Sequence, residues 1–226
     1  MKNSNMKFAV IVTIVAIALL AVIVVMSSNK SKEQQTVAEK SEVELTGQPI
    51  LGEQNAPVTV VEFGDFKCPS CKAWGETIYP QLVEDYLIPG DIKFSYVNVL
   101  FHGEESIIGA MAAESVFKQD PASYWDFHKA VYDAQPEVNH DDVWLSKEKM
   151  LEVAKDFPTI KQDILTKDLE EELTMPQVTI DEKLYKKHKV TQTPTIVING
   201  MTIEDPFNYE AIKQMIDQEL EVTQND

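Results

Sequence analysis

The chain contains only two cysteines, Cys68 and Cys71, and two residues, Pro69 and Ser70, separate them. An apolar run at 58–63 precedes the pair and predicts a strand, and a helix is expected to begin at the proline. The free amides and the dipole at a helix start favour a thiolate and can lower a cysteine pKa from about 8.5 to about 3.5–7.5. A thiolate beside a second thiol can perform disulfide exchange.

Zinc binding and a structural disulfide are the two alternatives to redox chemistry for such a cysteine pair. A structural zinc site needs four ligands, but the chain has no second cysteine pair and its four histidines lie far apart in the sequence. A structural disulfide across two residues closes a very small loop and removes little entropy from the unfolded chain. Redox chemistry is therefore the favoured use of the pair.

The N-terminal residues 1–26 predict a membrane signal anchor. Residues 8–26 are uncharged, follow Lys2 and Lys7, and as a helix would span roughly 28 Å, enough for a bilayer core. No convincing cleavage site follows, so an uncleaved anchor is favoured over a cleaved signal. Lysines flank the run on both sides, but a stable dithiol oxidant belongs outside the reducing cytosol. We expect a single-pass protein of the cell membrane with an extracytoplasmic catalytic domain.

The remaining sequence divides into a tether and one domain. Residues 27–47 are polar without an apolar period and predict a tether, and residues 48–226 are enough for one domain with an insertion. The chain has a net charge of −17 and no arginine. This composition argues against nucleic-acid binding.

The apolar patterns of residues 48–226 predict an α/β fold. Strand 57–63, a helix from 69 towards 86 and strand 92–101 form a strand–helix–strand unit with the dithiol at the carboxyl end of its first strand, where open α/β sheets place their chemistry. Residues 104–173 are helical in pattern. The C-terminal part predicts a helix at 176–188, a hairpin at 195–203 and a helix at 209–220.

These elements make up a thioredoxin fold interrupted by a helical insertion at about 104–175. The sequence resembles the DsbA family of extracytoplasmic thiol-disulfide oxidoreductases, and within it the membrane-anchored BdbD-type proteins of Gram-positive bacilli. The resemblance extends from about residue 48 to the C-terminus. The matching motifs are Val60–Cys71, Tyr124–His128 and Thr193–Thr195.

The resemblance assigns roles to the dithiol residues. Cys68, nearer the helix start, is expected to be exposed and to form the mixed disulfide with a substrate. Cys71 is expected to be buried and to act as the resolving thiol. Pro69 and Ser70 tune the pair, and Ser70 stands where many DsbA-type enzymes have histidine.

The resemblance also assigns three further residues, Thr193, Pro194 and Glu62, to the expected site. A cis bond is expected between Thr193 and Pro194, in a loop beside the dithiol that offers the Thr193 backbone to a substrate chain; the alternative is a trans proline at a strand start. Glu62 lies in an otherwise apolar strand. It is expected to be buried beneath the dithiol and to help move the proton of Cys71, and the alternative is a solvated carboxylate at the sheet edge.

The function implied by the resemblance is the introduction of disulfide bonds into unfolded exported proteins with free thiols. A DsbB-like, quinone-coupled membrane oxidase of the BdbC type would reoxidise the dithiol, and the protein is expected to be a monomer. The dithiol chemistry requires no cofactor. The alternatives are a reductase or isomerase on the same fold, and a non-redox holdase for unfolded exported chains.

The resemblance also implies a structural calcium ion away from the dithiol. Calcium prefers oxygen ligands. The candidate ligands are Gln48, Glu114 and Asp181, which come from the expected first strand, the insertion and the helix that returns to the sheet.

Overall fold

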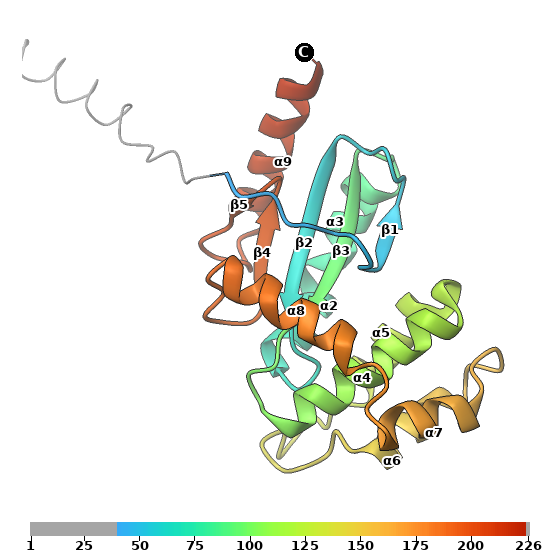
Figure 1. Ribbon diagram of the computed structural model, residues 1–226. Helices are drawn as coiled ribbons and strands as arrows, with labels where there is room; N and C mark the ends of the chain where they lie inside the picture. Colours follow the sequence, from blue (N-terminus) through green and yellow to red (C-terminus); the bar gives the residue numbers. More distant parts are fainter. Residues whose placement is uncertain (1–39, 225–226) are drawn as a thin grey trace, which may run out of the picture. The chain divides into compact units, whose positions relative to one another are not determined.

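The computed structural model describes residues 40–224, which form a five-stranded mixed sheet covered by helices (Figure 1). The strand order is β1-β3-β2-β4-β5. Strands β2 and β3 are parallel, and the other neighbouring strands are antiparallel. The strands are β1 Ile50–Gly52, β2 Val58–Gly64, β3 Ile92–Asn98, β4 Thr195–Ile198 and β5 Met201–Thr202.

The helices follow the predicted order, but the helix expected from 69 to 86 is broken at Ile78. Pro80 cannot donate an amide hydrogen bond and its ring crowds the preceding turn, so a new helical segment begins there. The helical segments are α2 Pro69–Thr77, α3 Tyr79–Leu82, the π-helical turn η1 Val83–Leu87, α4 Glu104–Gln119, the 3-10 turn η2 Pro121–Ser123, α5 Tyr124–Asp133, α6 Lys147–Ala154, α7 Gln162–Glu170, α8 Met175–Lys187 and α9 Tyr209–Gln224.

Both faces of β2 are buried. Val58 and Val60 face a core that includes residues of α2, α3 and α9, whereas Val61 and Phe63 face the core beneath α8. Successive side chains of a strand point to opposite faces, which explains why this central strand reads as a continuous apolar run. The predicted thioredoxin fold is thus confirmed in its sheet and its flanking helices.

Helices α4 to α7 form the insertion, which has a core of its own. This core includes Met111, Phe127 and Leu165, and it continues to Phe66 and to both cysteines. Figure 1 shows the insertion helices gathered beyond the end of the sheet at which β2 and β3 finish. The dithiol therefore lies where the insertion meets the sheet.

Residues 40–47 correct one boundary, because this part of the predicted tether packs on the domain. The Ser41 amide donates to the Gly200 carbonyl at 3.1 Å, and Lys40 pairs with Glu219 at 2.8 Å. Val43 and Leu45 pack against the core beneath α8. The tether prediction missed this segment because Val43 and Leu45 alternate with polar residues in an extended chain, and such a pattern has no helical period.

The predicted anchor, residues 1–26, and residues 27–39 of the tether lie outside the described residues. Within residues 40–224, no helix is both long enough and apolar enough to cross a bilayer. The three buried clusters of this part lie entirely within one compact unit, Lys40–Asp226. Because every buried cluster of the described residues lies inside it, we expect this unit to fold by itself.

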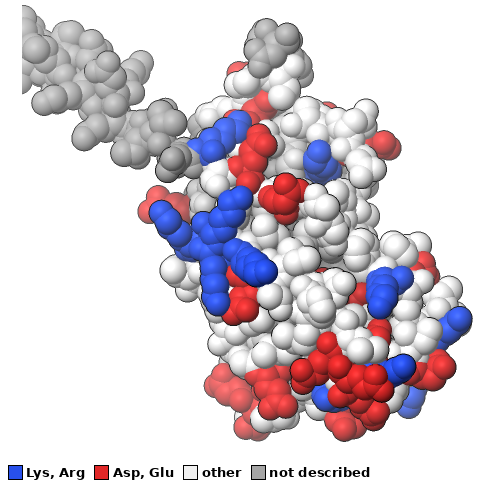
Figure 2. Space-filling view, viewed as in Figure 1, with Lys and Arg blue, Asp and Glu red and all other residues white. Residues whose placement is uncertain are grey.

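Charge is unevenly distributed over the visible face. Figure 2 shows acidic side chains gathered over the insertion helices and a group of lysines over the C-terminal end of α8. Lys186 and Lys187 occupy the last turn of that helix, where positive charge stabilises the helix dipole.

Candidate functional site

The dithiol lies at the start of α2, just after the carboxyl end of β2. Cys68 is the N-cap residue, Pro69 follows in the first turn, and Cys71 lies one turn further on. The expectation that Cys68 is exposed is wrong: its residue is 7% exposed, against 1% for Cys71. The reason is that Cys68 packs between the insertion core and the loop of Thr193, whose carbonyl oxygen lies 3.5 Å from the Cys68 Sγ.

The two thiols differ strongly in acidity. The pKa of Cys68 is lowered to about 5, chiefly by a hydrogen bond from the Cys71 thiol. The Thr193 side chain and the backbone amides of Cys71 and Ser70 lower it further. Burial raises the pKa of Cys71 well above its ordinary value. At neutral pH the pair is therefore a Cys68 thiolate that accepts a hydrogen bond from a protonated Cys71.

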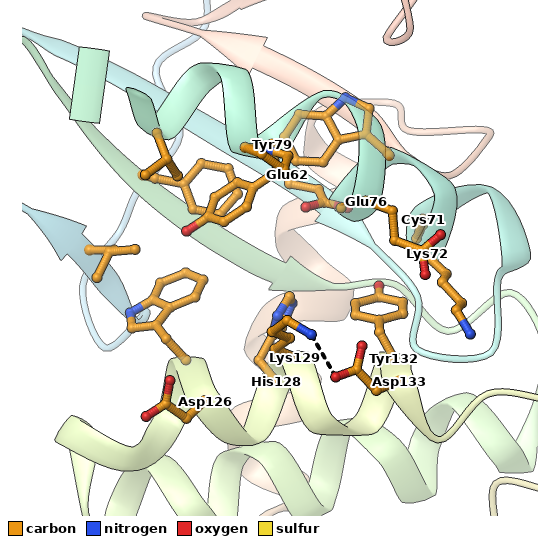
Figure 3. A pocket seen from close by; sticks show the side chains of 17 residues that line it. Glu62, Cys71, Lys72, Glu76, Tyr79, Asp126, His128, Lys129, Tyr132 and Asp133 are labelled. Carbon is orange, nitrogen blue, oxygen red and sulfur yellow. Dashed lines mark hydrogen bonds and ion pairs between the residues drawn. The ribbon is translucent and has the colours of Figure 1, made fainter. Parts of the chain in front are cut away.

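Glu62 lies within β2 and is buried beneath the dithiol, with 3% of the residue exposed. It pairs in register with Tyr96 of β3 and Ile196 of β4. Burial, and next the charge of Cys68, raise its pKa well above the usual range. Its Oε1 atom has no hydrogen-bond partner. The alternative of a solvated glutamate at the sheet edge is thus wrong, and the buried Glu62 carboxyl lines the same cleft as Cys71 (Figure 3).

The Thr193–Pro194 peptide bond is cis, as predicted. The loop leads directly into β4 and brings Thr193 to Cys68. Pro194 is buried, whereas Thr193 is partly exposed. The loop therefore presents backbone groups beside the reactive sulfur, at a place where an extended chain could pair with them.

Asp65, in the turn between β2 and α2, organises the loop before the dithiol. Its carboxylate accepts hydrogen bonds from Phe101 N at 3.0 Å and Ser106 Oγ at 2.8 Å, and lies 2.8 Å from His102 Nδ1. Its own amide points at the Cys71 Sγ, 3.5 Å away. Nothing in the sequence around Asp65 indicates this role, because an aspartate after a strand is most often a turn residue.

Two lysines flank the dithiol and fasten it to the loop between α5 and α6. Lys67 Nζ donates to the Asp142 carbonyl and pairs with Glu105 at 2.9 Å. Lys72 Nζ donates to the Gln135 carbonyl at 3.1 Å. The Gln135 side chain in turn donates to the Phe66 carbonyl at 3.2 Å. These contacts fix the insertion against the segment that carries the cysteines.

The residues expected to bind calcium lie together, with one addition. Asp181 accepts from Gln48 Nε2 at 2.7 Å and from Asn98 Nδ2 at 2.7 Å, and Asn98 Nδ2 also lies 3.3 Å from Glu114 Oε1. All four residues are buried, and we call them the amide–carboxylate cluster. Asn98 was missed because it ends an apolar strand, and only the fold shows which residues it meets.

Two buried carboxyls at close range are costly unless protons or a cation accompany them. Burial and the charge of Asp181 raise the pKa of Glu114 to about 8, and burial raises the pKa of Asp181 to about 6. The amide oxygens of Gln48 and Asn98 have no hydrogen-bond partner. Since amide N and O positions interchange by a flip, the cluster can present four side-chain oxygen ligands, which suits calcium. Within residues 40–224, no group of three or more His, Cys, Asp or Glu could hold a metal.

Comparisons with known proteins agree with this geometry. The Thioredoxin family model matches residues 44–218. Disulfide bond formation protein D of Bacillus subtilis (strain 168) is 42% identical over 192 residues, covering 85% of this chain and 86% of the relative. Probable disulfide bond formation protein D of Bacillus anthracis is 33% identical over 225 residues, covering 97% and 99%. The crystal structure of oxidised BdbD from Bacillus subtilis superposes with a TM-score of 0.78 at 41% identity, covering 80% of this chain and 97% of that chain.

Proposed function

Because the chain belongs to the thioredoxin family and is a protein-disulfide oxidoreductase related to the D-type disulfide bond formation proteins, we propose that it introduces disulfides into exported proteins. The observation that carries this proposal is the contrast between the stabilised Cys68 thiolate and the protonated Cys71. A stabilised thiolate is a good leaving group, and its stability makes the disulfide form oxidising.

The exchange proceeds in two steps that balance electrons and protons. A substrate thiolate attacks the Cys68 sulfur of the disulfide, the Cys68–Cys71 bond breaks, and Cys71 takes its electrons and a proton, for which Glu62, the buried acid that acts on the pKa of Cys71, is the proposed donor. A second substrate thiolate then attacks the substrate sulfur of the mixed disulfide. Cys68 departs as a thiolate, so the substrate is oxidised by two electrons and the enzyme is reduced.

The site residues have distinct parts in this mechanism. Pro69 starts the helix, the Ser70 amide supports the thiolate, and Thr193 and Pro194 form the loop along which the substrate chain pairs. The reduced enzyme needs an electron acceptor, and a DsbB-like, quinone-coupled membrane oxidase of the BdbC type is the proposed one. Residues 1–26 would hold a monomeric domain near that partner on the extracytoplasmic side.

The equilibrium redox potential of residues 40–226 against glutathione tests whether the dithiol acts as an oxidant or as a reductant of substrates. We expect a value nearer the about −120 mV of DsbA than the about −270 mV of thioredoxin. A value near that of thioredoxin would support a reductase instead. If a Cys68→Ser variant supported full disulfide formation in exported proteins, the chain would be a holdase rather than an oxidase.

A structural calcium ion is the second part of the proposal. Gln48, Asn98, Glu114 and Asp181 would hold it, and the ion would neutralise the two carboxylates and join the segment before β1 to β3, α4 and α8. Calorimetric titration of residues 40–226 with calcium should show a heat of binding. Thermal unfolding in the presence of calcium should show a higher melting temperature. Glu114→Gln should weaken binding, and the exposed Glu182→Gln in α8 is the matched control. The absence of both heat and a melting shift in the parent protein would refute the site.

A further inference from the structure

A cleft of about 530 Å³ lies between α2 and α3 on one side and α5 on the other (Figure 3). Its volume is within the range of small-molecule sites, about 300–1,000 Å³. Its lining is mainly apolar and aromatic, with the Cys71 residue at one end. The aromatic residues that line it are Trp74, Tyr79, Phe94, Trp125 and Tyr132.

The aromatic wall is fixed in place before any ligand arrives. Trp74 and Phe94 are stacked with ring centroids 6.1 Å apart, and the Phe94 and Trp125 centroids lie 5.5 Å apart. Trp74 Nε1 donates to the Pro206 carbonyl at 2.8 Å. A ligand that enters the cleft would therefore meet rings that need little reordering.

Two polar atoms in the cleft lack partners. Glu62, almost fully buried, leaves its Oε1 without a hydrogen bond, and the buried Nε2 atom of His128 also has none. Figure 3 shows both side chains in the space between the helices. Burial raises the pKa of Glu62 well above its usual range, which favours the neutral acid, and lowers the pKa of His128 to about 3, so His128 is neutral at pH 7. The deep part of the cleft thus offers uncharged hydrogen-bonding atoms.

The rim does not select for ligand charge. Lys72 and Lys129 are outnumbered by Glu76, Asp126 and Asp133, so the rim has a net charge of only −1, and Lys129 pairs with Asp133 at 2.6 Å. A charged ligand would have to lose its hydration among the rings without a buried counter-charge, which is costly.

We propose that this cleft is a binding site for a neutral aromatic compound of one or two rings that carries one hydroxyl group, with the rings against the partly exposed Tyr79 and Trp125 and the hydroxyl at Glu62. The rings would replace water along the apolar wall, and the hydroxyl would satisfy the unpartnered Oε1. The site shares Glu62 and Cys71 with the proposed oxidase, but binding requires no redox reaction, so it can be tested whether or not the proposed function holds.

The first experiment is a ¹⁹F NMR titration of reduced residues 40–226 with 4-fluorophenol and, separately, with 4-fluorotoluene. The two probes have nearly the same size, and the second carries a methyl group in place of the hydroxyl. Because a buried polar group left unpaired costs about 1–3 kcal/mol, we expect 4-fluorophenol to bind at least about fivefold more tightly. No saturable binding of either probe would overturn the proposal.

Gly75 provides a way to block the cleft without touching the cysteines or Glu62. It lines the cleft from the exposed side of α2, and a Cβ there would meet nothing within 4 Å. Gly75→Phe should fill the space and weaken 4-fluorophenol binding by more than tenfold, whereas Gly75→Ala should leave it within about twofold. Unchanged binding by a folded Gly75→Phe variant would show that the probe binds elsewhere.

The hydroxyl position is tested at Glu62 itself. Glu62→Leu should remove the preference for 4-fluorophenol, and Glu62→Gln, which can still hydrogen-bond, should retain it. A full preference in Glu62→Leu would contradict the assigned position. If a variant fails to fold, nuclear Overhauser contacts between the probe and Trp125 in the parent protein decide the location, and their absence overturns the proposal.

Discussion

Replacement of Cys71 by alanine should raise the pKa of Cys68. The hydrogen bond from the Cys71 thiol is the largest of the contributions that lower this pKa to about 5. A hydrogen bond to a charged group contributes about 1.5–3 kcal/mol, and one pH unit corresponds to about 1.36 kcal/mol. The Cys68 pKa in Cys71→Ala should therefore lie about one to two units higher, at roughly 6–7. The amides of the helix start remain and prevent a return to the ordinary value.

Two assays on residues 40–226 measure this pKa. Thiolate absorbance at 240 nm is followed against pH, and the rate of alkylation by iodoacetamide is measured over the same range. Cys71→Ser is the matched control, since a serine hydroxyl can still donate to the thiolate and should keep the pKa near that of the parent. If Cys71→Ala and Cys71→Ser had the same low pKa, the helix start rather than the neighbouring thiol would stabilise the thiolate.

Three other predictions concern the surroundings of the dithiol. Glu62→Leu should slow attack of a model thiol on the oxidised dithiol about a hundredfold at pH 7, because the departing Cys71 loses its proton donor; stopped-flow oxidation of the thiol measures this, with Cys68 alkylation in the reduced protein unchanged. Gly64→Ala should lower the free energy of unfolding in urea by about 1–3 kcal/mol, because its Cβ would lie 2.8 Å from the Tyr96 hydroxyl; a loss below about 0.5 kcal/mol contradicts this. In the amide–carboxylate cluster, the pKa of Glu114 is raised to about 8, so folding binds protons, and stability in a chelator should fall as pH rises from about 4 to 8. A melting temperature that rises over this pH range would contradict the predicted loss of stability.

Much of the fold could be predicted from the sequence because local sequence patterns specify its strands, turns and helix starts. The apolar run before the cysteines, the proline after Cys68 and the Asn199-Gly200 turn each specify their element without tertiary information. Glu62 stood out as a lone acid in a buried strand. These signals identified the strand, the helix start and the carboxyl beneath the dithiol.

The remaining features depend on contacts between distant segments. Nothing near Asn98 in sequence indicates that it meets Asp181, which is 83 positions away. The burial of Cys68 likewise results from the Thr193 loop, 125 positions downstream. The helix break at Ile78 was missed because the apolar period continues through it. Only Pro80, which lacks an amide hydrogen and crowds the preceding turn, indicates the break in the sequence.

The two lysines beside the dithiol have a consequence for its behaviour in salt. Both ammonium groups are occupied by carbonyls of the α5–α6 loop and by Glu105, and every contribution that lowers the pKa of Cys68 is a hydrogen bond from a neutral donor. Mobile ions screen the attraction between charges over about 10 Å at 0.1 M, but they do not reach a buried donor that touches the sulfur. The pKa of Cys68 should therefore change little with ionic strength, because it depends on short contacts that folding itself assembles.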